Sequence, residues 1–163
     1  MAKITFKNGS EYEKKLKKLE QLYASDAPLE KAVAAGAAVV ADKIRSNLEA
    51  LPEVEYRRLE EGESFHGIPK GQKKDLADSF GLTPIGRDKN GFVNTKAGFE
   101  GYGSYPTKAY PQGLPNALLA RATESGSSVR QKTPFVEPAV KATRSEAVDA
   151  MGKVIDEQVK SIF

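Results

Sequence analysis

The segment Thr133-Pro134-Phe135-Val136-Glu137-Pro138-Ala139 marks the start of the last long helix of this chain. Two prolines four residues apart cannot both lie inside a regular helix, but Pro138 suits a first turn, where its missing N–H is not needed. Apolar residues then recur at helical spacing: Val140, Ala147, Met151, Val154, Ile155, Val159 and Ile162. The pattern predicts an amphipathic helix from about Pro138 to Ser161, with Phe135 packed at its base.

Two further helices are predicted near the N-terminus. In the first, four large apolar residues share one face, opposite a run of lysines; the apolar residues are Tyr12, Leu16, Leu19 and Tyr23, and the lysines are Lys14, Lys15, Lys17 and Lys18. We interpret the lysine face as solvated, with a phosphate-binding patch as the alternative. The second helix lies between Pro28 and Pro52, and its apolar stripe is Leu29, Val33, Gly36, Val40, Ile44 and Leu48.

Small side chains dominate the second helix between Ala32 and Ala41. Small residues let another backbone approach closely. The sequence leaves two interpretations open, tight packing inside one subunit and contact with a neighbouring subunit, of which the first is favoured.

The middle of the chain predicts β structure. Asn90-Gly91 lies between two apolar-rich runs and is a strong hairpin signal, because both residues tolerate positive φ. Pro84 cannot donate to a ladder, so its strand should be an edge strand or carry a bulge. The Gly/Tyr/Pro-rich stretch 101–115 suits either an intersubunit arm or a lid on its own core. A short helix over Asn116–Glu124, ended by Gly126, should follow.

These patterns predict a single α+β domain over residues 1–163: two N-terminal helices, a central antiparallel hairpin or sheet, and a C-terminal amphipathic helix packed on the sheet. Residues 53–75 show no clear period and predict a long mobile loop, either functional or disordered. Its basic end carries Lys70, Lys73 and Lys74, and its lone His66 is interpreted as a loop residue, not a metal ligand.

Composition narrows the chemistry. The 163 residues include no cysteine, one histidine and no tryptophan, with a net charge of +3 and a pI near 9.0. The sequence contains no Walker loop, dinucleotide fingerprint or Gly-x-Ser-x-Gly elbow, so we expect no enzyme, metal or cofactor. It also has no apolar run long enough to cross a bilayer, and the N-terminus lacks the apolar core of a secretory signal, so we expect an intracellular or virion protein.

Three motifs follow one another between Leu76 and Ala139. The first is matched by Leu76, Ser79 and Phe80, the second by Glu124, Gly126 and Ser127, and the third by Pro134, Phe135, Pro138 and Ala139. In order and rough spacing over residues 10–160, the chain resembles the small morphogenesis family of long-tailed bacteriophages and prophages, described as tail-component, neck or tail-completion proteins. Lys74 stands where that family has glycine, and Ser125 replaces its usual aromatic residue.

The resemblance implies a structural virion protein without catalytic residues, made in the host cytoplasm and placed at the head–tail junction. Its partners would be further copies in a ring, the portal or connector, and the tail tube or terminator, with no membrane and no small-molecule substrate. Lys70, Lys73 and Lys74, or the Lys14–Lys18 face, would line a channel and contact packaged DNA without sequence preference. Two alternatives remain: a tail terminator that caps the tube, and a small basic DNA-binding protein, whose binding should weaken steeply with salt.

Overall fold

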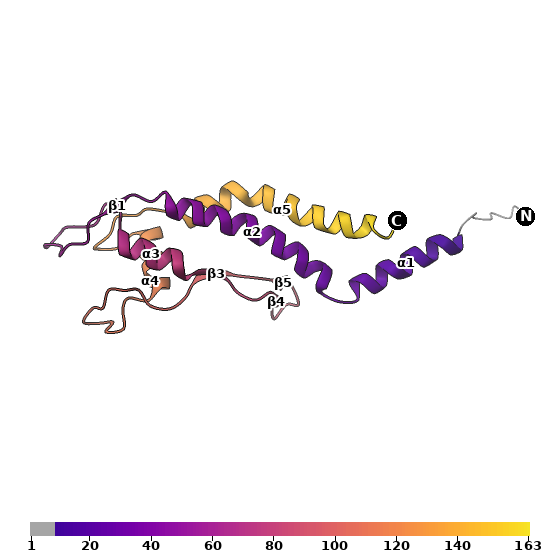
Figure 1. Ribbon diagram of the computed structural model, residues 1–163, viewed down its shortest axis with the longest axis horizontal. Coiled ribbons are helices and arrows are strands. Elements are labelled where there is room, and N and C mark those ends of the chain that lie inside the picture. The colour runs from indigo at the N-terminus through magenta and orange to yellow at the C-terminus, as the bar shows by residue number, and fades with distance from the viewer. Residues whose placement is uncertain (1–8) are drawn as a thin grey trace, which may run out of the picture.

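The computed structural model describes residues 9–163, and within that range it contains five helices and six short strands (Figure 1). The helices are α1 (Gly9–Tyr23), α2 (Ala27–Glu49), α3 (Lys70–Ser79), α4 (Asn116–Ser125) and α5 (Val136–Lys160). The strands are β1 (Glu53–Val54), β2 (Ile68–Pro69), β3 (Phe80–Leu82), β4 (Gly86–Arg87), β5 (Val93–Asn94) and β6 (Ala97–Phe99). The molecule is elongated, and its class is a helix-rich α+β mixture with little sheet.

The long axis of the molecule is an antiparallel pair of helices, because α5 lies along α2 (Figure 1). The prediction of two N-terminal helices and a C-terminal helix is confirmed, and α5 begins two residues before Pro138. The predicted partner of the last helix was the sheet, whereas its extensive packing is against α2. A two-stranded ribbon offers too little apolar surface to cover a 25-residue helix, and the small-residue stripe of α2 offers more.

Close approach of the two helices depends on Gly36. A Cβ atom built there would lie 2.6 Å from Met151 Cγ and 3.1 Å from the carbonyl oxygen of Ala147. Ala32 and Ala41 on α2 are buried as well. The small residues of α2 therefore serve packing inside one chain, which is the favoured of the two sequence interpretations.

The hydrophobic core lies where α2, α3, α4 and the start of α5 meet. Its buried members are Ala41, Ile44, Leu48, Leu51, Ile68, Leu76, Phe80, Leu119, Ala120, Phe135 and Ala139. A row of rings links the ribbon to the base of α5, because Phe99 lies 5.2 Å from Phe80 and 5.9 Å from Phe135, centroid to centroid. The prediction that Phe135 packs at the base of the last helix is confirmed.

The predicted hairpin forms a two-stranded antiparallel ribbon between residues 80 and 99. β3 pairs with β6 and β4 pairs with β5, and the ladder is interrupted around Pro84, which has no N–H to donate. At the tip, Gly91 adopts φ +83°, and Asp88 Oδ1 accepts hydrogen bonds from the backbone N–H groups of Asn90 and Phe92. The ribbon stays narrow and does not widen into a sheet.

The segment predicted as a loop over 53–75 is shorter than expected, because α3 begins at Lys70. β1 and β2 pair in parallel and close the loop at its base. The part of the loop next to β2 is held by the buried Arg130. The Arg130 guanidinium donates hydrogen bonds to the carbonyl oxygen of Gly67 and to Gln72 Oε1, and it lies 5.5 Å from the Phe65 ring centre. Burial removes the guanidinium from water, which lowers the pKa of Arg130. The contacts with Gly67, Gln72 and Phe65 replace part of the lost hydration of the charge.

Helix α1 differs from the other long helices, because none of its residues is buried. It projects from the end of the molecule at which α2 begins (Figure 1). The turn between the two helices is tied to the ribbon tip, since Arg87 Nε donates to Asp26 Oδ2 at 2.6 Å and Arg87 Nη2 donates to Asp26 Oδ1. The hydrogen bonds from Arg87 hold the pKa of Asp26 below its ordinary value.

Candidate interaction surfaces

Residues of the second and third sequence motifs contact each other at the start of α5. The carboxylate of Glu124, at the end of α4, accepts hydrogen bonds from the backbone N–H groups of Phe135, Val136 and Glu137 at 2.7, 2.9 and 2.8 Å. These donors have no partner within the helix, and a negative charge there is favoured by the helix dipole. Glu124 therefore caps α5 from a different helix, a role that sequence spacing did not reveal.

The other motif residues surround this cap. Leu76, Phe80 and Ala139 are buried in the core, and the Ser79 hydroxyl donates to the carbonyl oxygen of Leu76 at 3.2 Å. Gly126 ends α4 with φ +81°, a conformation that other residues rarely adopt.

The remaining members direct the chain into α5. The Ser127 N–H donates to the carbonyl oxygen of Arg130, and Pro134 and Pro138 lie exposed on either side of Phe135. Most of the motif residues thus serve one task, which is to join α3, α4 and α5.

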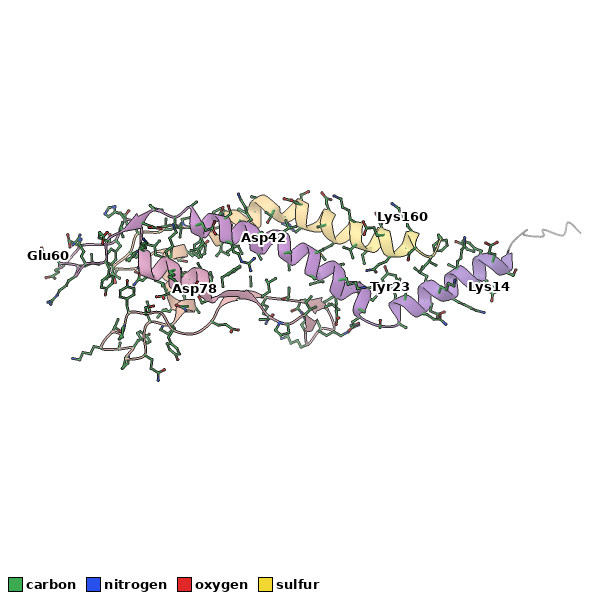
Figure 2. The ribbon with its side chains drawn as sticks, in the orientation of Figure 1. Lys14, Tyr23, Asp42, Glu60, Asp78 and Lys160 are labelled. Atoms are coloured by element: carbon green, nitrogen blue, oxygen red, sulfur yellow. The ribbon has the colours of Figure 1, made fainter. Side chains whose placement is uncertain are left out.

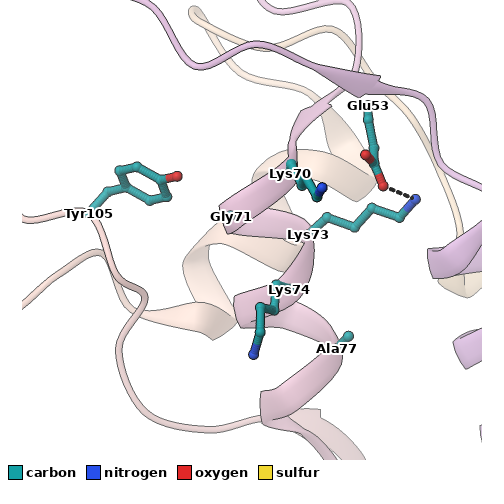
Figure 3. A pocket seen from close by; sticks show the side chains of 7 residues that line it. All are labelled: Glu53, Lys70, Gly71, Lys73, Lys74, Ala77 and Tyr105. Atoms are coloured by element: carbon teal, nitrogen blue, oxygen red, sulfur yellow. Dashed lines mark hydrogen bonds and ion pairs between the residues drawn. The ribbon is translucent and has the colours of Figure 1, made fainter.

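The lysines at the start of α3 line a hollow of about 620 Å³ (Figure 3). Its walls are Glu53, Lys70, Gly71, Lys73, Lys74, Ala77 and Tyr105. The Lys73 ammonium donates to Glu53 Oε1 at 3.0 Å and to the carbonyl oxygen of Leu51 at 3.1 Å. Lys74 is paired with Asp78, which raises its pKa. The sequence therefore found three neighbouring lysines, but two of them already have carboxylate partners.

Aromatic side chains join this lysine hollow to the two long loops. Tyr105 lies directly against Gly71, and its ring stacks on Tyr56 with the centroids 4.6 Å apart. Tyr56 in turn stacks on Phe65 at 6.1 Å. The base of the 101–115 stretch is thus a lid on its own chain, and the role of Tyr56 was missed because residues 53–63 show no periodicity.

A second hollow, of about 390 Å³, lies on the neighbouring side of α3. It is lined by Asp75, Asp78, Ser79, Glu100, Gly101, Tyr102 and Asn116, and we call it the acidic hollow. Asp75 holds the lid by accepting hydrogen bonds from the N–H and the hydroxyl of Ser104 at 2.8 and 2.6 Å. Asn116 is only 4% exposed; its Nδ2 donates to the carbonyl oxygen of Glu100, while its Oδ1 accepts no hydrogen bond from the described residues.

The predicted lysine face of α1 lies at the other end of the molecule (Figure 2). Lys14, Lys17 and Lys18 are exposed, with Lys17 paired to Glu13 at 2.9 Å. Lys15 points elsewhere, since its ammonium donates to the carbonyl oxygen of Phe163 at 3.3 Å. On the opposite side of the helix, Tyr12 is 59% and Leu16 44% exposed, whereas Leu19 and Tyr23 are half-buried, so half of the apolar stripe is uncovered.

Within residues 9–163, no group of three or more His, Cys, Asp or Glu side chains is arranged to hold a metal ion. In the same range, none of the helices combines the length and hydropathy needed to span a membrane. His66 lies in the loop ahead of β2, as expected.

Comparison of the chain with protein-family models, curated proteins and solved structures found no match.

Proposed function

We propose that this chain is a structural protein of a long-tailed bacteriophage or prophage, located at the head–tail junction, where copies assemble into a ring that completes or joins the tail. It acts through its surfaces and transforms no substrate. Its partners are other copies, the portal or connector, and the tail tube or terminator.

The observation that carries the proposal is the junction built by the motif residues. Glu124 caps the helix that Phe135 and Ala139 anchor in the core, and Leu76 and Phe80 complete that core. A motif whose members determine a fold supports the resemblance to a structural family, because such a family preserves a shape and not a reaction centre.

The arrangement of surfaces gives a second line of support. α1 and the lid loop both project from the helix pair (Figure 1). A closed ring is built from heterologous contacts, in which a patch on one copy meets a different patch on the next. An elongated subunit with separate projections supplies such patches.

Contact with packaged DNA is part of the proposal but rests on fewer charges than the sequence indicated. Lys70 forms no salt bridge with the described residues, whereas Lys73 and Lys74 each pair with a carboxylate. We expect Lys70→Ala to weaken any contact with DNA more than Lys73→Ala does. A reconstruction of the neck with these lysines, and the Lys14–Lys18 face, on its outer surface would contradict a channel role.

The test is a phage or prophage from which the gene is deleted. We expect filled heads and separate tails in electron micrographs, and joined, infectious particles when the chain is supplied in trans. Infectious, tailed particles made without the chain would overturn the proposal.

Two rival functions are separated by binding. A tail terminator would bind isolated tails and not filled heads. A free-standing DNA-binding protein is suggested by the pI near 9.0, although a net charge of only +3 counts against it; such a protein would shift DNA in a gel at low salt and lose it steeply as salt rises.

A further inference from the structure

We propose that α1 of one copy docks on the acidic hollow of a second copy, head to tail. The inference rests on the proposed function, because it names the contact through which copies join, and it goes beyond that function by assigning the two surfaces.

Charge is the first argument. Of the seven residues that line the acidic hollow, Asp75, Asp78 and Glu100 are acidic and none is basic, and Asp78 is paired with Lys74 of its own helix. On the face of α1 opposite its apolar stripe, Lys14 and Lys18 are exposed and form no salt bridge with the described residues, whereas the exposed Lys17 is paired with Glu13. Opposite charges on two surfaces steer encounter and fix the register of a contact.

Uncovered apolar surface is the second argument. Tyr12 and Leu16 lie exposed on α1, and Tyr102, which lines the acidic hollow, is 59% exposed. Large exposed apolar side chains on a helix without buried residues indicate a surface that is covered in an assembly.

Position is the third argument. α1 points away from the body of its own chain, and the acidic hollow lies beside α3 toward the other end (Figures 1 and 2). The two surfaces differ, so each copy offers one of each, and the contact repeats from copy to copy. Contacts of this kind close into a ring when the rotation between copies permits it.

Charge reversal tests the contact. We call α1 the arm, and the arm variant is Lys14→Glu with Lys18→Glu. The hollow variant is Asp78→Lys with Glu100→Lys. Asp75 stays unchanged because it holds Ser104. The control is Lys43→Glu with Lys153→Glu, two exposed lysines on α2 and α5 that form no salt bridge with the described residues and give the same change in charge as the arm variant.

The readout is the mass of the purified species at low salt. We expect the wild type and the control to form rings, and each charge variant alone to stay monomeric. An equimolar mixture of the two variants should form rings in which the variants alternate, because the native arm fits the native hollow and the reversed arm fits the reversed hollow. A chain carrying all four reversals should form rings again.

Crosslinking gives an independent measurement. The chain has no cysteine, so a mixture of single-cysteine chains, Lys18→Cys and Glu100→Cys, reports one pair of positions. We expect a disulfide between the two chains, and no such dimer from Lys153→Cys mixed with Glu100→Cys. Circular dichroism checks that each variant is folded.

Several results would overturn the docking. They are rings formed by the arm variant, a wild type that stays monomeric at every concentration, and a mixture of the Lys18→Cys and Glu100→Cys chains that forms no disulfide between them. Failure of the proposed function looks different: tails would join normally without the chain, whatever the mass of the purified protein.

Discussion

The two ends of this molecule are built on different principles. At the end where α2 stops, Leu48, Leu76 and Phe135 are buried together, and Arg130 and Glu124 satisfy backbone groups around them. At the end where α2 starts, α1 has no buried residue and contacts Phe163 through Tyr12 and Lys15, and the turn that follows it is tied to the ribbon by the Arg87–Asp26 ion pair. We call these regions the packed end and the open end.

The difference shows where stability resides and where surface is left for other molecules. Burial of apolar surface is the main favourable term in folding, so the packed end supplies most of the free energy of unfolding. The open end contributes little to that free energy and keeps Tyr12 and Leu16 exposed. Substitutions at the packed end should therefore change folding, and those at the open end should change association.

Removing a core ring should have the largest effect. Phe135 is 1% exposed, so Phe135→Ala should lower the free energy of unfolding by about 3 to 5 kcal/mol. The matched variant at the open end is Tyr12→Ala, for which we expect less than about 0.5 kcal/mol. Chemical denaturation of the two variants, under conditions in which both are monomeric, measures both values, and equal losses would contradict the distinction between the ends.

Loss of the α5 cap should come next. Glu124→Ala leaves three backbone N–H groups without their carboxylate, and we expect a loss of about 1 to 3 kcal/mol in the free energy of unfolding. Glu137→Ala removes only the exposed pair with Lys141 and should cost less than about 0.5 kcal/mol. A Glu124→Ala protein as stable as the wild type would show that the cap contributes nothing.

Alanine substitution at two helical glycines should change the free energy of unfolding in opposite directions. Gly36→Ala places a methyl group against Met151 and the Ala147 carbonyl, and the crowding should outweigh the gain in helix propensity, for a net loss of about 1 kcal/mol. Gly152→Ala meets no atom within 4 Å and should raise the free energy of unfolding by up to about 1 kcal/mol. Thermal unfolding measures the stability of both variants against the wild type. A stabilising Gly36→Ala would mean that α2 and α5 separate easily.

The smallest effect concerns the exposed loop between β1 and β2. Hydrogen bonds from Arg57 and from the Glu60 N–H lower the pKa of Glu63 to about 2. A lowered native pKa stabilises the fold at pH values above the ordinary pKa, and this stabilisation is lost as the pH falls from the ordinary value of 4.5 through about 2.

The measurement for this loop is an NMR titration of the Glu63 carboxyl group. We expect a midpoint near 2 in the wild type and a shift toward 4.5 in Arg57→Gln. A wild-type midpoint already near 4.5 would show that the Arg57 pair does not persist in solution.

Prediction from sequence succeeded where the signal is local. The apolar spacing of Leu29 to Leu48 located α2, Asn90-Gly91 located the ribbon turn, and Pro138 located the first turn of α5. Helix α3 was missed, because Lys70–Ser79 buries only Gln72 and Leu76 and so presents almost no apolar period.

Local signals fell short at the candidate surfaces. They identified Lys70, Lys73 and Lys74 as a basic cluster, but not the Glu53 and Asp78 partners that neutralise two of them. Glu53 is 20 residues from Lys73, and no short-range pattern joins the two. The acidic hollow was missed for the same reason, since α3, the end of the ribbon and α4 each supply part of it.

The sequence by itself determined the positions of every helix except α3, the ribbon turn, the mixed α+β class and the small-residue stripe, because these depend on periodicity and on the conformations of single residues. The tertiary structure alone decided that α5 packs on α2, that Glu124 caps α5 from another helix, and that α1 remains uncovered. These features depend on which surfaces meet across long separations, and burial and hydrogen bonding select among partners only once the whole chain is folded.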